Sequence, residues 1–151
     1  MQSAIDLSRE KMNANHGGPF GAVVVKDDEI IGYGWNKVTS ENDPTAHAEV
    51  SAIRDACAKL KTFDLTGCEI YTSCEPCPMC LGAIQWARIG EVIYANTAED
   101  ADKIAGFDDE NFYDEFKKDP ADRKIPFKQM NRDEAIKVFE EWRDKTDKIE
   151  Y

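Results

Sequence analysis

The chain has 151 residues, of which 42% are hydrophobic and 32% are charged, and these values are ordinary for a single globular domain. The formal net charge of −11 excludes the basic surface of a general nucleic-acid binder and favours a small uncharged or cationic partner, although solubility alone also explains it. An apolar run of the roughly 20 residues that span a bilayer does not occur, and the first residues lack a secretion pattern, so we expect neither membrane association nor export.

The first part of the chain predicts a helix, a hairpin and a second helix. Weak helical periodicity covers 2–14, and the turn-forming residues at 16–19 end it. Apolar, β-branched residues at 21–25 and an apolar run at 30–35 flank a polar turn, which is the pattern of a β-hairpin. Apolar residues then return at helical spacing over 46–60.

Strands and helices alternate in the rest of the chain. In order, we predict a strand at 69–73, a helix at 77–88, a strand at 91–95, acid-rich helical stretches including 108–117, a last strand at 126–130 and a last helix at 133–145. The strands at 21–25 and 91–95 are apolar throughout, and such strands are usually covered on both faces. We therefore predict one α/β domain over 1–151, a three-layer α/β/α sandwich with a mixed sheet of about five strands.

The five cysteines are an odd number, and three of them crowd into 74–80. This distribution disfavours disulfides and favours a metal site in a reducing compartment. We therefore expect a cytoplasmic protein. Cys57 and Cys68 are most simply buried apolar residues.

The strongest functional pattern consists of His47, Cys77 and Cys80. One imidazole and two thiols give the ligand count of a catalytic zinc site that leaves its fourth position open. Cys77 and Cys80 are three residues apart at the start of a predicted helix, where they share a face and where the helix N-terminus favours thiolates. His47 opens a predicted helix of its own, so we predict one zinc ion held between two helix starts.

Glu49 lies two residues after His47 and is not needed as a ligand. Residues two apart do not share a helix face, so the pair works only in the first turn, where the Glu side chain can reach back toward the metal. A Glu carboxylate is far too weak a base for bulk water, but a bound metal ion acidifies water strongly. Glu49 is therefore the predicted general base of a hydrolytic enzyme.

Cys74 keeps two alternatives open. With His47, Cys77 and Cys80 it would complete a closed four-ligand zinc site, and the evenly spaced cysteines would also suit an iron–sulfur cluster. A closed site would make the protein a structural zinc module or a redox sensor instead of an enzyme. The position of Cys74 before Pro76, at the end of a predicted strand, argues against both alternatives.

Two motifs carry a family resemblance. "HAE" at 47–49 and "PCPMC" at 76–80 resemble the signature H-x-E…P-C-x-x-C of the zinc-dependent nucleobase and nucleoside deaminases, which have the cytidine deaminase-like fold. Longer blocks resemble the bacterial guanine deaminases, and they are "GGPFGAVVV", "NDPTAHAEVSAIR", "YTSCEPCPMCLGAIQWAR", "AGFDD" and the final Glu150-Tyr151. The resemblance implies the hydrolysis of guanine to xanthine and ammonia.

The resemblance also implies roles for individual residues. His47, Cys77 and Cys80 would bind zinc, and Glu49 would carry a proton from water to the ring. Asp109 would accept hydrogen bonds from the amidine edge of the base and relay a proton to the leaving amine. The expected substrate-binding residues are Asn36, which would hydrogen-bond the base, Phe20, which would stack on it, Tyr151, which would close the site, and also Ala48 and Trp86, the latter otherwise a core residue.

In this family the partner is a small purine, the protein is typically a homodimer, and the C-terminal segment, here about 132–151, is expected to be exchanged between subunits. Hydrogen-bonding patterns support guanine, because O6 and N7 accept hydrogen bonds while the amidine edge donates two. An ionised Asp109 only accepts, and the Asn36 amide can donate, so the pair complements guanine. Guanosine and other aminated heterocycles stay open as substrates. By itself, Asn36 would be an ordinary turn residue and Asp109 part of a solvated acidic stretch.

Overall fold

The computed structural model describes residues 1–107 and 110–150, and it leaves the side chains of 110 and 111 aside. Two compact units make up the chain, Met1–Glu110 and Asn111–Tyr151, and each is described by itself. Among the described residues, no helix combines the length and the apolar character that crossing a membrane requires.

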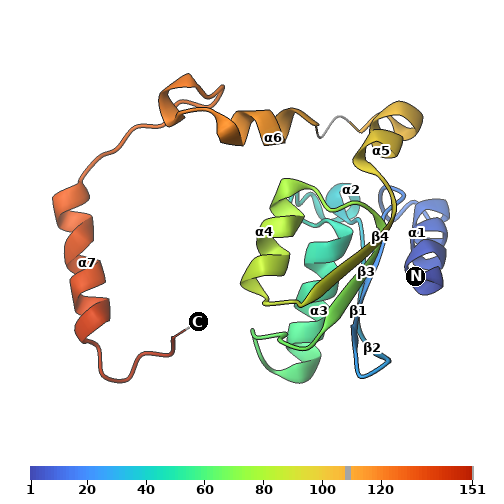
Figure 1. Ribbon diagram of the computed structural model, residues 1–151, viewed down its shortest axis with the longest axis horizontal. Coiled ribbons are helices and arrows are strands. Elements are labelled where there is room, and N and C mark those ends of the chain that lie inside the picture. The colour runs from blue at the N-terminus through green and yellow to red at the C-terminus, as the bar shows by residue number, and fades with distance from the viewer. Residues whose placement is uncertain (108–109, 151) are drawn as a thin grey trace. The chain divides into compact units, whose positions relative to one another are not determined.

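The first unit is built on a mixed sheet, in which the described residues form four strands in the order β2-β1-β3-β4 (Figure 1). β1 (Gly21–Lys26) and β2 (Glu29–Trp35) form the predicted antiparallel hairpin. β3 (Glu69–Cys74) pairs antiparallel with β1, and β4 (Glu91–Asn96) pairs parallel with β3. β1 and β3 are therefore the central strands of the sheet.

Helices cover both faces of this sheet and give the predicted three layers. α1 (Gln2–Asn13) packs on β1 and β3 from one side, while α3 (Ala48–Leu60) and α4 (Pro78–Trp86) lie together on the other side (Figure 1). α2 (Val38–Glu41) and α5 (Ala98–Ala105) are shorter connections. The cytidine deaminase-like α/β fold is confirmed.

Small residues set the distance between α3 and the sheet. Gly32 and Gly34 of β2 face the helix, and a Cβ atom on Gly34 would lie 2.0 Å from the carbonyl oxygen of Ala48. Alanines on the facing side of α3, including Ala52, are fully buried against the sheet. The start of α3 is thereby held directly against the backbone of β2.

Two details of the predicted sheet are wrong. Residues 126–130 are not a strand, so the described sheet has four strands instead of about five. Pro126 has no N–H to donate, and Phe127 and Met130 are 61% and 77% exposed in the single chain, so this run has neither a ladder partner nor a core to cover. β4 is an edge strand that is largely exposed within its unit, whereas β1 is buried on both faces as predicted.

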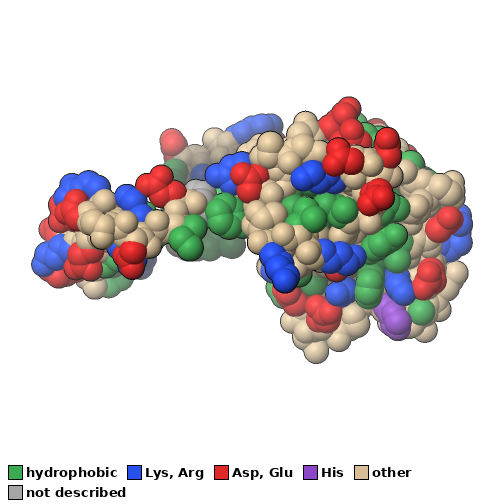
Figure 2. Space-filling view, turned by 90° about the horizontal axis from the view of Figure 1, so that it is seen from below, with side chains coloured by type: hydrophobic (Ala, Val, Ile, Leu, Met, Phe, Trp, Pro, Cys, Tyr) green, Lys and Arg blue, Asp and Glu red, His purple; other side chains and the backbone are tan. Residues whose placement is uncertain are grey.

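The second unit consists of α6 (Glu110–Lys117), a short 3₁₀ helix (Pro120–Asp122) and α7 (Arg132–Asp144). The two α-helices match the predicted positions, but α7 contains no buried residue. Green apolar side chains interrupt the charged surface in Figure 2. The exposed large apolar residues that follow Lys124 are Ile125, Phe127, Met130, Ile136, Val138, Phe139, Trp142 and Ile149.

We predict that Gly34→Ala lowers the free energy of unfolding by at least about 2 kcal/mol, because its Cβ must displace the first turn of α3. Urea denaturation of the purified variants measures this change. Gly90→Ala is the matched control, since its Cβ would make an ordinary 3.7 Å contact with Cys68 O and should change stability by less than about 0.5 kcal/mol. Equal stability of the two variants would show that α3 does not depend on this close approach.

Candidate active site

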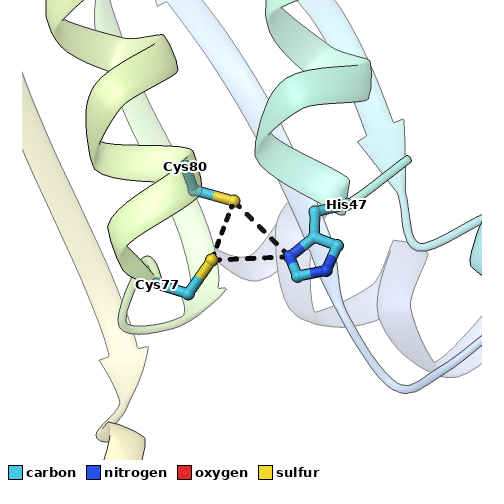
Figure 3. A group of neighbouring side chains, drawn as sticks. All are labelled: His47, Cys77 and Cys80. Carbon is cyan, nitrogen blue, oxygen red and sulfur yellow. Dashed lines mark hydrogen bonds between the residues drawn. The ribbon is translucent and has the colours of Figure 1, made fainter. Parts of the chain in front are cut away.

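Three potential metal ligands meet where two helices begin. His47 is the N-cap residue of α3 and Cys77 is the N-cap residue of α4, both with extended backbone angles, and Pro78 occupies the first turn of α4. Proline favours this position because its fixed φ suits a helix start and its missing N–H is not needed there. The side chains of His47, Cys77 and Cys80 point toward one another in Figure 3.

The spacing of the ligand atoms fits one tetrahedral ion. The distances from His47 Nδ1 to Cys77 Sγ, from His47 Nδ1 to Cys80 Sγ, and between the two sulfurs are each 3.6 Å. A tetrahedral zinc with bonds of about 2.3 Å to sulfur and about 2.1 Å to nitrogen requires separations of about 3.6–3.8 Å. The described residues form one such metal-binding group, and it contains only three ligands. A fourth position therefore stays open for solvent or substrate.

Cys77 and Cys80 shift each other's thiol pKa in opposite directions. A hydrogen bond joins Cys77 Sγ and Cys80 Sγ, and this contact, aided by His47, lowers the pKa of Cys77 to about 4. The same hydrogen bond raises the pKa of Cys80, which is also fully buried. A divalent cation reverses this preference and favours thiolate at both positions. Cys77 is thus already favoured as a thiolate, whereas Cys80 becomes a thiolate only with the bound ion.

Glu49 lies in the first turn of α3 and reaches back to the ligands, as the sequence requires. The residue is 6% exposed, and its Oε2 lies 3.4 Å from Cys80 Sγ. Oε1 lies 3.4 Å from the hydroxyl oxygen of Thr72, a residue of β3. Burial raises the pKa of the Glu49 carboxyl group above its ordinary value, which brings it toward the range useful for proton transfer near neutral pH.

Asn36 follows β2 and is held by the loop before β1. Its Oδ1 accepts hydrogen bonds from the backbone N–H groups of Gly18 and Val38, at 3.3 and 3.2 Å. Its own backbone N–H donates to the carbonyl oxygen of Phe20. Because Oδ1 is engaged, the amide N–H₂ is the end left to donate to a ligand, as the interpretation of Asn36 as a base-binding residue requires.

Phe20 lies edge-on to Phe107, with ring centroids 4.8 Å apart and an interplanar angle of 74°. Phe107 belongs to the block "AGFDD", but the sequence had drawn attention only to Asp109 in it. Asp109 and Tyr151 lie outside the described residues. Neither Phe107 nor Thr72 carries a sequence signal of its own, because their partners are distant in the chain.

Ala48 and Trp86 are the other described residues that we expected to bind the substrate. Ala48 is buried between His47 and Glu49, where its backbone begins α3. Trp86 is the last residue of α4, at the end opposite the ligands, and it is 70% exposed. The structure therefore does not bring Trp86 to the ligand group, and its interpretation as a core residue is wrong for the single chain.

Cys74 does not belong to the metal-binding group formed by the described residues. It ends β3, it is buried, and its Sγ contacts the carbonyl oxygen of Thr97 at 3.5 Å, where α5 begins. This placement disfavours the closed four-ligand site. Cys68 is buried and Cys57 is half-buried, as expected for apolar packing, and burial raises the pKa of both thiols.

Comparisons with known proteins agree with this geometry. Residues 1–96 match the family described as the cytidine and deoxycytidylate deaminase zinc-binding region. The chain belongs to this family. Its cofactor is zinc, and His47, Cys77 and Cys80 are the group suited to hold the ion.

Individual relatives and solved structures show which proteins this chain is similar to. The guanine deaminase of Bacillus subtilis is 53% identical over all 151 residues, which cover 96% of that protein. Its X-ray structure superposes with a TM-score of 0.96 over 99% of this chain and 95% of that one. A guanine deaminase structure from Nitrosomonas europaea has a TM-score of 0.67 and 36% identity over 72% of this chain and 63% of that one. A tRNA-specific adenosine deaminase of Aquifex aeolicus is 49% identical over 51% of each chain.

We predict that Cys77→Ser loses zinc while Cys74→Ser retains it. Cys77 belongs to the three-ligand group, whereas Cys74 does not. Elemental analysis of the purified variants and competition with a zinc chelator measure the content and the affinity. Loss of a ligand should weaken zinc binding by more than the 10- to 100-fold that loss of a supporting residue causes. Equal loss from both variants would indicate a closed site that includes Cys74.

Proposed function

We propose that this protein is a zinc-dependent guanine deaminase that hydrolyses guanine to xanthine and ammonia. The observation that carries the hydrolytic chemistry is the buried Glu49 carboxyl group beside three ligand atoms at tetrahedral spacing. The choice of guanine is supported by the full-length similarity to the guanine deaminase of Bacillus subtilis. The partner we propose is therefore a small purine, in line with the net charge of −11, which does not suit a nucleic acid.

When bound at this site, zinc supplies a Lewis acid that acidifies a water molecule at its open position. Glu49 Oε2 is placed to accept a proton on that side and to deliver it to the purine ring nitrogen next to C2. Glu49 has to hold the proton between these two steps, as a general acid–base group does. Water adds across the C2–N3 double bond, so that a C–O bond forms at C2 and one proton goes to N3. The C2–amine bond then breaks, the amine takes up the remaining water proton and leaves as ammonia, and guanine and water give xanthine and ammonia.

Asn36 supplies the group that recognises the other edge of the base in this proposal. The backbone N–H groups of Gly18 and Val38 fix its Oδ1, so its amide N–H₂ can donate to O6 or N7. Phe20 would stack on the ring, supported by its edge contact with Phe107. Asp109 would accept from N1–H and the exocyclic amine, and Tyr151 would close the site.

We predict that the wild-type protein releases ammonia from guanine and that Glu49→Gln loses about 100- to 10,000-fold in kcat, the usual contribution of a general acid–base group. The variant should keep its zinc, because Glu49 is not one of the three ligands. An ammonia-release assay with guanine, guanosine, adenine and cytosine measures both the substrate and the loss.

Glu29→Gln is the control, since this exposed carboxylate lies in the hairpin and should leave kcat unchanged. Turnover of guanosine without turnover of guanine would contradict the proposal that guanine is the substrate. It would not contradict the proposed deamination chemistry. Full activity of Glu49→Gln would contradict the proton-transfer role.

We also propose that the protein forms a homodimer in which the segment from about 132 to 151 is exchanged between subunits, each subunit holding one zinc ion. The support is the apolar surface of the second unit, where α7 exposes Val138, Phe139 and Trp142. Exposed apolar side chains of this number are rarely left to water in a single protein chain. A second copy of the chain would bury them.

We predict that a chain truncated after Met130, co-expressed with Glu49→Gln chains, regains activity that each variant lacks alone. The truncated chain supplies an intact metal site and the other supplies the missing segment, so exchange is required for recovery. Light scattering of the wild type should give twice the mass of one chain. A dimer without recovered activity would support association and contradict the exchange of the segment.

A further inference from the structure

A buried hydroxyl group contacts the Glu49 oxygen that does not face Cys80 Sγ. Thr72 is 1% exposed, and its Oγ1 lies 3.4 Å from Glu49 Oε1 and 2.9 Å from the carbonyl oxygen of Cys74. The hydrogen bond to Cys74 anchors the side chain to its own strand. The contact with Glu49 Oε1 then places this anchored hydroxyl group against the carboxyl group.

The backbone that carries Thr72 is fixed on both sides. In β3, Thr72 is the register partner of Ala22 in β1 and of Tyr94 in β4. A β-branched side chain is also stiff at χ1, so the position of Oγ1 follows closely from the position of the strand. The sheet therefore presents Oγ1 at a defined point beneath the first turn of α3.

The Glu49 carboxyl group is not fixed by its own torsion, and it takes its orientation from contacts with Thr72, with Cys80 Sγ and with its own backbone N–H. Its terminal torsion joins sp³ and sp² carbons, and such torsions have broad energy wells instead of sharp rotamers. The two oxygens have different neighbours, because Oε1 faces Thr72 while Oε2 faces Cys80 Sγ. A contact that holds Oε1 therefore decides where Oε2 points.

We propose that Thr72 is a positioning residue that sets the orientation of the Glu49 carboxyl group and keeps Oε2 directed at the metal ligands. Because Oγ1 donates its one hydrogen to the carbonyl oxygen of Cys74, its lone pairs are left to accept a hydrogen bond from the protonated Glu49 carboxyl group. The ionised carboxylate can share that hydrogen only as a second, weaker acceptor at 3.4 Å. The inference rests on the proposed deaminase function, and Thr72 itself touches neither substrate nor metal.

The test compares Thr72→Val with Thr72→Ser and the wild type. Valine keeps the shape and removes the hydroxyl, whereas serine keeps the hydroxyl and removes a methyl group. We expect Thr72→Val to lose about 10- to 100-fold in kcat, the scale of a small misplacement of a reacting group, with KM changed less than about threefold. Zinc content should stay at the wild-type value, and Thr72→Ser should recover kcat to within about threefold of the wild type.

The control variant Ile70→Val distinguishes a positioning role of Thr72 from a purely structural role in the core. Ile70 is fully buried two residues earlier on β3, and its truncation removes core contact without touching Glu49. This control should lower the melting temperature and leave kcat unchanged. If kcat falls in Ile70→Val as it does in Thr72→Val, or if serine fails to restore it, the inference is wrong.

Crystal structures of the wild type and Thr72→Val give a readout that needs no turnover, and a rotated Glu49 carboxyl group is the expected result. An unrotated carboxyl group would overturn the inference whatever the substrate. If Thr72→Val does not fold, Thr72→Ala carries the same comparison. A wild-type chain that turns over another base but not guanine would contradict the proposed substrate, and kcat on that base would then test Thr72.

Discussion

The close approach of α3 to β2 is the constraint on which the site depends. Gly32 and Gly34 leave no side chain between the strand and the helix, so the backbone of Ala48 rests directly on the sheet. His47 and Glu49 flank Ala48 and inherit this position. A larger residue at Gly34 would displace the first turn of α3 and shift the imidazole and the carboxyl group together. The geometry of the metal site is thus determined by backbone packing at some distance from the ligands.

Burial of Glu49 is costly for the fold and useful for the chemistry. A carboxylate with so little exposure is disfavoured in its charged form, which is why its pKa is raised. A cation held by His47, Cys77 and Cys80 offsets this cost, so metal binding and deprotonation of Glu49 favour each other. The same burial keeps bulk water away from the carboxyl group that we propose transfers the proton.

Much of the first unit could be predicted from sequence because its signals are local. The spacing of Cys77 and Cys80, Pro78 at a helix start and the apolar periodicity of α3 all act within one or two turns. The contact between Thr72 and Glu49 could not be predicted, since it depends on the pairing of β3 with β1 and on the depth of α3 over the sheet. The exposure of β4 was missed for a similar reason, because an apolar strand does not say how many helices cover it. Residues 126–130 resembled a strand in composition, but Pro126 and the absence of a pairing partner outweighed that local preference.

In the proposed function, the chemistry and the recognition of the substrate depend on different kinds of structure. The ligands and Glu49 lie at helix starts within 1–96, the part shared across the zinc-binding deaminase family, including a tRNA-specific adenosine deaminase that matches only 51% of this chain. Asn36 and Phe20 instead belong to a strand end and a loop, and they are fixed by backbone hydrogen bonds and an aromatic contact with Phe107. Similarity to the guanine deaminase of Bacillus subtilis extends through the second unit as well. We therefore expect a difference in substrate to involve these loops and residues beyond 96, where the similarity to the guanine deaminase of Bacillus subtilis continues and the matched family region has ended.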